Sequence, residues 1–167
     1  MANRGVVHPL LSTQRHVIAG RDFIARVEAD GCRVGVQSDE EGAWWVLGVE
    51  PGGLAETGAT PGEAYLRFSE AFKDVLSDLA EDAGDFDAFR VAVETFVHEV
   101  NRQTEVEWRT AAEAFRKGLV RPEPPFDTLP KKSADTPCTV KVERQDKRAA
   151  FKSVDAGIDE PAFARAA

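Results

Sequence analysis

The chain has little of what several functional classes require. Its 167 residues include only two cysteines, Cys32 and Cys138, and they form no Cys-x-x-Cys motif. This usage is typical of a reduced chain rather than a disulfide framework. No apolar run approaches the roughly 20 residues of a membrane-spanning helix, and the first 20 residues lack the apolar segment of a secretory leader. We therefore expect a cytoplasmic protein with no membrane association.

Positive charge is outnumbered, with 21 lysine and arginine residues against 29 aspartate and glutamate residues. The formal net charge is −8 and the sequence pI is about 5.0. Acid is concentrated in residues 21–117, which hold 21 acidic and 10 basic residues. A surface of this sign repels nucleic acid phosphates, so direct nucleic acid binding is not expected. A basic protein is the partner that the charge favours.

Motifs of catalysis and cofactor binding are also missing. Pro51-Gly52-Gly53 lacks both the lysine of a P-loop and the spacing of a dinucleotide fingerprint, and no serine lies in a Gly-x-Ser-x-Gly turn. We predict no catalytic residue, no cofactor and no metal site, and hence no enzyme. One alternative stays open, a magnesium-dependent nuclease, which needs converging acids. Its only candidate residues are Glu28, Asp30, Asp74 and Asp78.

The histidines and cysteines suggest no other site. Glu94 and His98 lie four residues apart on a predicted helix, with Glu105 further on, but no second histidine completes a zinc motif there. We interpret Glu94 and His98 as a surface ion pair. His8 and His16 lie in the N-terminal arm described below without an evident partner. Cys32 is interpreted as a small strand hydrophobe and Cys138 as a loop thiol.

What the chain does have is a strong helix signal from Pro61 to Asp82. Thr60 is suited to the N-cap, proline to the first helical position, and Glu63 to a capping box. Apolar residues recur every three to four positions on one face, and acidic residues recur on the other. The apolar face is Tyr65, Phe68, Phe72, Val75/Leu76 and Leu79; the acidic face is Glu63, Glu70, Asp74, Asp78 and Asp82.

Two-residue alternation before this helix predicts strands at 23–28, 32–37 and 43–49, with Asp30-Gly31 as a hairpin turn and a short segment at 54–57. The predicted fold class is α+β. A small antiparallel sheet of three to four strands packs on one helix, with its other face in water. A long second helix and a Pro-rich extended C-terminal tail follow.

The second helical pattern begins at Phe86. Unbroken to Lys117, it would give a helix of about 30 residues and about 45 Å, longer than a small sheet covers, which favours a homodimer or higher oligomer. A break near 101–104 is the competing interpretation. The expected organisation is a flexible N-terminal arm at 1–20, an α+β domain at 21–117, and a Pro-rich linker with a weakly ordered tail at 118–167. Thr139 to Glu143 is expected to add an edge strand, here or on a partner.

The segment from Gly42 to Ala64, with its Pro-Gly break and Gly-x-Thr-x-x-Glu-Ala motif, resembles the HicB family of bacterial antitoxins. The likeness covers about residues 23–79. It implies a partial RNase H-like fold without nuclease chemistry, which binds a small basic ribonuclease of the HicA type. The DNA-binding segment that often follows in that family is not found here.

These observations lead to a function. We expect a non-enzymatic, antitoxin-like protein that neutralises a basic HicA-type partner. Complementary charge speeds such an association and selects the partner. Trp44 and Trp45 are adjacent and must point to opposite faces of a strand, so one of them needs cover from the second helix or from an interface. The predicted partner-binding residues are Glu63, Glu70, Asp74, Asp78, Trp44 and Trp45. The alternative is a structural or adaptor protein that pairs through strand addition at 139–143.

Overall fold

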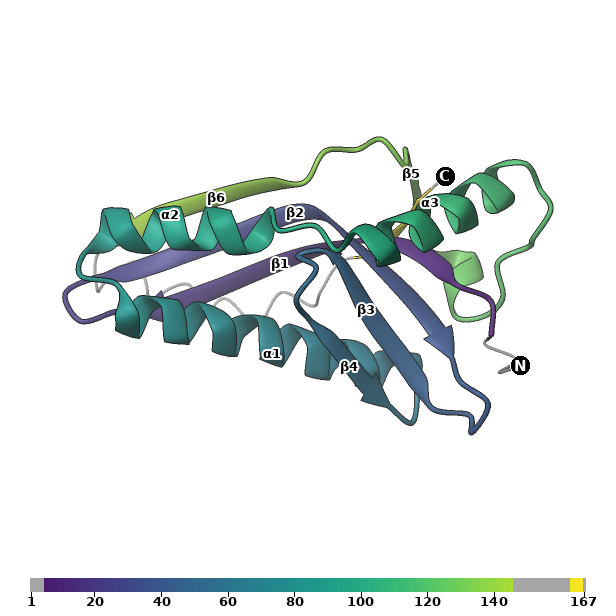
Figure 1. Cartoon of the computed structure of the whole chain (residues 1–167), viewed down its shortest axis with the longest axis horizontal. Helices are drawn as coiled ribbons and strands as arrows, with labels where there is room; N and C mark the ends of the chain where they lie inside the picture. The colour runs from purple at the N-terminus through teal and green to yellow at the C-terminus, as the bar shows by residue number, and fades with distance from the viewer. Residues whose placement is uncertain (1–4, 146–162, 167) are drawn as a thin grey trace.

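One mixed sheet with three helices makes up the structure, a computed structural model that describes residues 5–145 and 163–166 (Figure 1). The strand order is β4-β3-β2-β1-β7-β5, and β6 pairs separately with β2. The fold is therefore α+β as predicted, but the sheet has seven strands among these residues rather than three or four. The strands are β1 (His8–Ala19), β2 (Ile24–Ser38), β3 (Trp44–Glu50), β4 (Ala55–Gly58), β5 (Lys131–Lys132), β6 (Thr139–Gln145) and β7 (Phe163–Ala166). The helices are α1 (Pro61–Asp82), α2 (Phe86–Val97), α3 (Arg102–Arg116) and the short 3₁₀ turn η1 (Phe126–Thr128).

Strand β1 lies where the sequence predicted an arm without regular structure. It pairs with β2 along almost its whole length and with β7 on its other edge. Residues 8–12 are buried on both faces, so this strand shows no alternation of polar and apolar residues. Alternation marks strands with one wet face, and its absence here concealed a central strand.

Strand β2 runs through the Asp30-Gly31 pair that the sequence placed in a hairpin turn. Gly31 has φ +71°, and the register against β1 shifts between Ser12 and Gln14. This is a β-bulge inside one long strand. An Asp-Gly pair in which glycine has positive φ occurs in bulges as well as in turns. Here it is a bulge, because the residues on both sides of it pair with β1.

The sheet forks at this bulge. The edge of β2 that faces away from β1 pairs with β6 over Ile24–Asp30 and with β3 over Arg33–Ser38. Gly31 and Cys32 lie between the two partners. The pairing of β6 agrees with the edge strand predicted at 139–143 and places it within this chain.

Helix α1 begins and ends as the sequence predicts. Thr60 Oγ1 accepts a hydrogen bond from the Glu63 N–H, and Glu63 Oε2 accepts one from the Ala59 N–H. Tyr65, Phe68, Phe72 and Leu76 are buried against the sheet.

The second helical pattern is broken into α2 and α3, as the competing interpretation had it. Asn101 caps α3 by accepting hydrogen bonds from the N–H groups of Gln103 and Thr104. Two backbone bonds, Gly52 N–H to the Glu99 carbonyl and Asn101 N–H to the Val49 carbonyl, hold the break against the end of β3. No continuous 30-residue helix forms. The helix length that favoured an oligomer is therefore no longer an argument for one, and oligomerisation stays a prediction.

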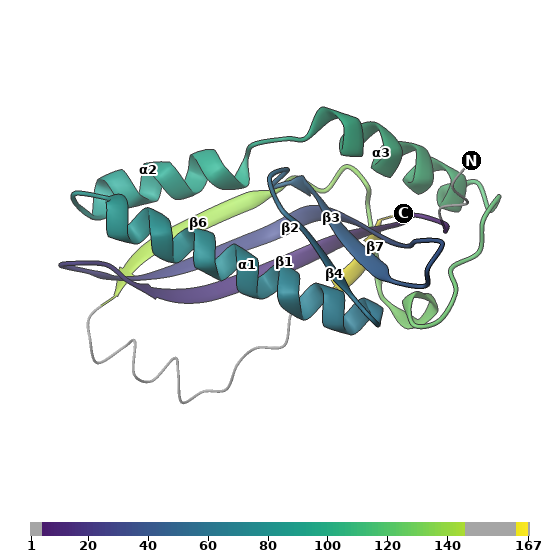
Figure 2. The ribbon, with the colours of Figure 1, turned by 60° about the horizontal axis from the view of Figure 1, so that its bottom comes forward.

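The helices cover both faces of the twisted sheet. Leu10 packs in a core with residues of α1 and α2, whereas its neighbour Leu11 packs with Trp108 of α3. Adjacent strand residues point to opposite faces, so α3 lies on the face opposite α1 and α2. Figure 2 shows α1 and α2 side by side along the long strands, with α3 at the end of the molecule opposite α2. The wet face that the sequence predicted is thus partly covered.

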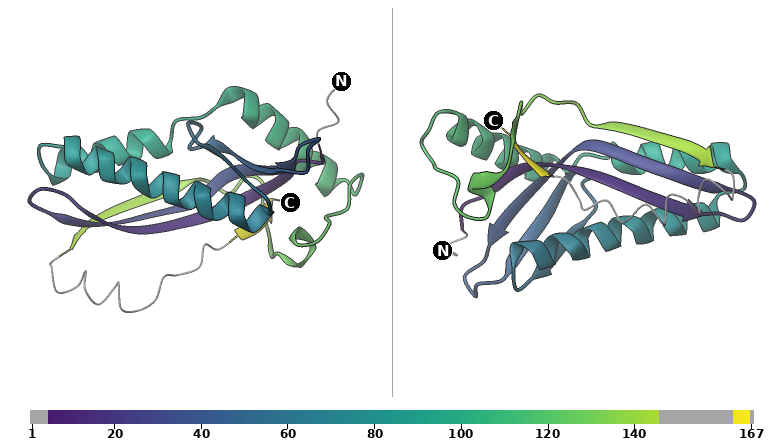
Figure 3. Two further views of the ribbon diagram at one scale, coloured as in Figure 1. Left: turned by 90° about the horizontal axis from the view of Figure 1, so that it is seen from below. Right: turned by 180° about the vertical axis from the view of Figure 1, so that it is seen from behind.

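The C-terminal part of the described chain returns to the sheet instead of forming a free tail. After the prolines, η1 places Phe126 in the core. Strand β5 then pairs with β7, and β7 pairs with β1 (Figure 3). Residues 146–162, predicted as part of the weakly ordered tail, lie outside the described residues. Within the described residues, no helix is long and apolar enough to cross a membrane.

Candidate functional sites

The acidic row on α1 consists of Glu70, Asp74 and Asp78, which lie one turn apart and are all exposed. No lysine, arginine or histidine among the described residues lies within ion-pair distance of them. Leu66, one turn before Glu70, is a large apolar side chain that is 59% exposed. The row therefore presents three carboxylates and one apolar side chain to solvent.

Glu63 does not belong to this row. Its carboxylate accepts the Ala59 N–H at 2.9 Å and pairs with Arg67 at 2.7 Å. These contacts cap α1 and neutralise the charge within the chain. Of the four acidic residues predicted to bind a partner, three thus remain available at the surface.

Trp44 and Trp45 point to opposite faces of β3, as adjacent strand residues must. Trp44 packs against the main core, with its ring 6.0 Å from that of Phe126. The indole N–H of Trp45 donates to Asp39 Oδ2 at 2.9 Å, and the side chain is half-buried. Both side chains are half-buried, so Trp44 packs against the core with part of its surface, and each tryptophan keeps some exposed surface.

The carboxylates proposed for a magnesium site do not gather within the described residues. Asp30 accepts hydrogen bonds from Thr13 and from its neighbour's N–H, and Glu28 pairs with Arg26. The Thr13 hydroxyl, first among the causes, lowers the pKa of Asp30. Asp74 and Asp78 form no metal-binding group with these two acids. The geometry gives the nuclease alternative no support.

A different set of donors meets at the fork in the sheet. Glu50 at the end of β3, His98 at the end of α2, and Cys138 just before β6 have ligand atoms within 4.8 Å of one another. Cys32 of β2 adds a fourth donor, because its Sγ lies 3.9 Å from Sγ of Cys138. We call these four residues the fork cluster. The interpretation of His98 as the ion-pair partner of Glu94 is wrong, since Glu94 pairs with Arg90 instead.

Close backbone packing builds the fork cluster. A Cβ added at Gly31 would lie 2.5 Å from the Pro137 carbonyl oxygen, so only glycine lets this loop approach β2. That approach brings Cys138 beside Cys32. The interaction with Cys138, burial, and the charges of Glu50 and Asp30 raise the pKa of the Cys32 thiol.

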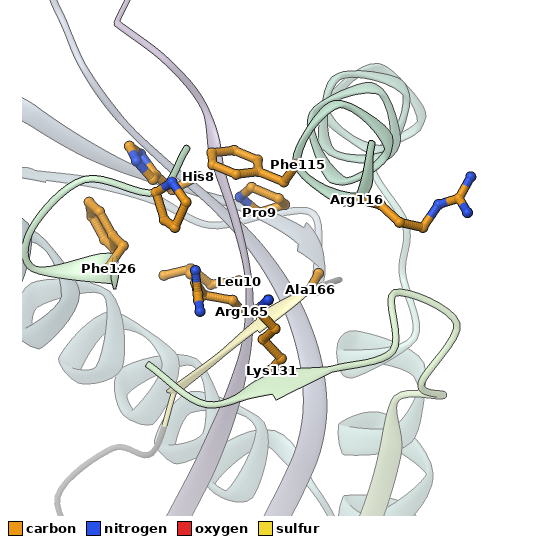
Figure 4. Close-up of a pocket in the computed structure, with 10 residues that line it drawn as sticks. His8, Pro9, Leu10, Phe115, Arg116, Phe126, Lys131, Arg165 and Ala166 are labelled. Atoms are coloured by element: carbon orange, nitrogen blue, oxygen red, sulfur yellow. The ribbon is translucent and has the colours of Figure 1, made fainter. Parts of the chain in front are cut away.

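A cavity of about 170 Å³ lies between β1, β7, η1 and the end of α3 (Figure 4). Aromatic and basic side chains converge on it. Phe115 and Phe126 form apolar walls, whereas Arg165 and Lys131 contribute positive charge. Arg165 donates its Nε–H to the Leu129 carbonyl at 3.2 Å, which fixes its position.

His8 is the unusual residue of this cavity. It is 4% exposed and stacks on Phe126 at 4.1 Å, yet neither ring nitrogen has a hydrogen-bond partner of good geometry among the described residues. Burial lowers its pKa, so the ring is neutral near pH 7. His16 is half-buried in β1, where its ring lies beside that of Phe72, and loss of solvent around the ring lowers its pKa to about 4. Neither histidine lies in a free arm.

Sequence reasoning missed both the fork cluster and the cavity. Their residues are far apart in the chain and share no short motif, so no local pattern could reveal them. The sequence showed only Cys32 in a predicted strand, Cys138 in a predicted loop and His98 on a predicted helix, with nothing to connect the three. Comparisons with known protein families, curated proteins and solved structures find no match to this chain. The resemblance to the HicB family therefore stays a prediction.

Proposed function

We propose that this protein is a non-catalytic binding protein whose α1 helix docks a basic partner, in the manner of an antitoxin that covers a HicA-type ribonuclease. The observation that carries the proposal is the acidic row: Glu70, Asp74 and Asp78 are exposed, aligned, and without an ion-pair partner among the described residues. Like charges four residues apart weaken a helix by a few tenths of a kcal/mol per pair. The row is thus a small local cost to folding that a partner's cations would offset.

Leu66 adds an apolar contact at the start of the row. Charge complementarity sets association rate and partner choice, whereas desolvated apolar contacts contribute more to lifetime. Leu66 is exposed and lies one turn from Glu70, so it can form the apolar contact that lengthens the lifetime of the complex. Leu66 and the acidic row lie on the same helix, α1, so binding a partner there requires no rearrangement of the sheet.

Reversal of the acidic row tests the proposal. The triple variant Glu70→Lys/Asp74→Lys/Asp78→Lys should bind a basic protein of the HicA type at least about tenfold more weakly than the wild type, because each lost charge pair contributes about 0.2–1 kcal/mol. Isothermal titration at two salt concentrations measures the loss. The wild-type affinity should fall with added salt, and that of the variant should not.

The matched control is Asp85→Asn/Asp87→Asn, which changes charge at the start of α2 and leaves the acidic row intact. This control should bind within about twofold of the wild type. Equal affinity of the triple variant and the wild type would refute the proposal.

A second candidate function is the binding of a small acidic ligand in the His8 cavity. The favouring observation is a buried imidazole near Arg165 whose ring nitrogens have no hydrogen-bond partner of good geometry among the described residues, with only the Val36 and Val6 backbone groups close by. Unpaired buried polar groups are rare, and a ligand carboxylate or phosphate would accept a hydrogen bond from the ring N–H and pair with the Arg165 guanidinium. At about 170 Å³ the cavity suits a ligand smaller than a typical cofactor.

The variant His8→Phe tests this second candidate. In the ligand-free protein it should raise the free energy of unfolding by about 1 kcal/mol, because an unsatisfied buried polar group costs about 1–3 kcal/mol. Urea denaturation followed by circular dichroism measures the change. A lower stability of His8→Phe would show that the ring nitrogens are already satisfied and would count against a ligand there.

A further inference from the structure

We propose that the fork cluster is a zinc site. Its donors are two sulfurs, one imidazole and one carboxylate, which is a ligand set that Zn²⁺ takes in proteins. The cluster is separate from the acidic row on α1, and the proposal does not depend on the function proposed for that row.

The donors lie close enough for side-chain movements to bring them around a tetrahedral ion. Zinc ligands lie about 2.0–2.3 Å from the metal, so neighbouring donor atoms in a tetrahedron are roughly 3.3–3.8 Å apart. The two sulfurs are 3.9 Å apart, close to this spacing. The Glu50, His98 and Cys138 donors lie within 4.8 Å of one another, so shifts of about an ångström bring these three to tetrahedral spacing. Cys32 lies outside that limit from at least one of Glu50 and His98, so its side chain must also move inward to become the fourth ligand. His98 is exposed at the end of its helix and is free to make such a shift.

The electrostatic surroundings favour a cation. His98 is the C-cap residue of α2, where the last carbonyl groups carry partial negative charge. Glu50 and Asp30 add negative charge beside the Cys32 sulfur. Arg33 pairs more closely with Glu105, at 3.1 Å, than with Glu50, whose Oε2 lies 3.7 Å away.

An ion can also reach the cluster. A hollow of about 190 Å³ opens onto Glu50 and Cys138, with Pro137 and Ala134 on its wall. Entry from solvent is one requirement of a genuine metal site, along with suitable ligand number and spacing.

Zinc would stabilise the sheet at the point where it divides. The cluster joins β2, β3, the end of α2 and the segment before β6, at the point where β2 changes its pairing partner. An ion held there would join β3, the start of β6 and the end of α2, which no β-ladder connects to one another within the described residues. This role is structural, because four protein ligands leave no open position for a substrate.

Metal titration of the full-length, reduced and chelator-treated protein tests the proposal. Cobalt should produce thiolate-to-metal charge-transfer bands and intense visible bands of a tetrahedral site, and zinc should displace it at one ion per chain. Competition with a chromophoric chelator should give a zinc dissociation constant below about 1 µM, since structural sites bind tightly.

Variants identify the ligands. Cys138→Ser and His98→Gln should each weaken zinc binding at least about a hundredfold, and Cys32→Ser should remove about half of the charge-transfer intensity. The exposed His98 is the safest position to change, because its side chain is not part of the core. Glu99→Gln, a neighbour outside the cluster, should bind zinc within about twofold of the wild type.

Three outcomes would overturn the proposal. The first is no zinc uptake at micromolar concentration by the folded, reduced protein. The second is unchanged uptake in Cys138→Ser and His98→Gln. The third is a Cys32–Cys138 disulfide, detected by mass spectrometry, in a protein that takes up no zinc after the bond is reduced.

Discussion

Replacing Trp108 with alanine is expected to lower the free energy of unfolding by about 3–5 kcal/mol, the usual cost of truncating a buried tryptophan. Trp108 is 1% exposed and fills the core between α3 and the sheet face that carries Leu11. Its indole Nε1–H lies 3.3 Å from the Leu10 carbonyl oxygen and 3.1 Å from that of Val34. The side chain therefore attaches α3 to two adjacent strands at once.

Chemical denaturation of Trp108→Ala and Trp108→Phe separates the two contributions. Phenylalanine keeps most of the apolar contact but loses the N–H donor, so it should cost about 1–2 kcal/mol. Val106→Ala, on the same helix and 66% exposed, is the control and should change stability by less than about 0.5 kcal/mol. A loss below about 1 kcal/mol in Trp108→Ala would contradict the packing of α3 on this face.

Replacing Glu105 with alanine is expected to lower the free energy of unfolding by about 2–3 kcal/mol. The change removes the closest anion of Arg33, which lies almost buried over the ring of Trp108. Breaking a fully buried ion pair typically costs about 3–5 kcal/mol. The value here is lower because Arg33 keeps Glu50 at 3.7 Å and the Glu105 side chain is 14% exposed.

The same pair predicts a dependence on pH. Arg33, first among the causes, lowers the pKa of Glu105 from its ordinary value of 4.5. In the unfolded chain the carboxyl group takes up its proton near 4.5, and in the folded chain it does so at lower pH. The stabilisation is therefore fully present above pH 4.5 and is lost as the pH falls through the folded-state pKa.

Denaturation curves at several pH values measure this effect. The difference in stability between the wild type and Glu105→Ala should be constant above about pH 5.5 and should shrink below pH 4.5. Glu107→Ala, two residues along α3, is the matched control and should show neither the loss nor the pH dependence. A difference that grows on acidification would contradict the ion pair.

Local chemistry made part of this fold predictable. Helix α1 could be placed to the residue because Thr60, Pro61 and Glu63 are capping residues whose roles depend only on their neighbours. The stripe of buried aromatic residues that follows has the helical period and a single plausible orientation. In such segments the sequence encodes structure within a few residues.

Other elements were decided by distant contacts. Strand β1 was missed because residues 8–12 are buried on both faces, and such a strand lacks a two-residue period. The Asp30-Gly31 pair was interpreted as a turn because bulges and turns both favour a glycine with positive φ. Only the register of β2 against β1 distinguishes the two structures.

The candidate sites follow the same division. Glu70, Asp74 and Asp78 were found because their spacing places them on one helix face. The fork cluster was not found, because Cys32 and Cys138 are 106 residues apart and meet only where the sheet divides. His98 was assigned to its helical neighbour Glu94 on spacing alone, whereas the end of α2 turns it toward β3 and β6.

Coexpression with a basic protein of the HicA type is the most direct test of the proposed binding function. If that protein arrests growth when it is expressed alone, coexpression of this chain should restore growth, and the Glu70→Lys/Asp74→Lys/Asp78→Lys variant should fail to do so although it accumulates in folded form. Equal rescue by the variant and the wild type would contradict the claim that α1 carries the binding surface.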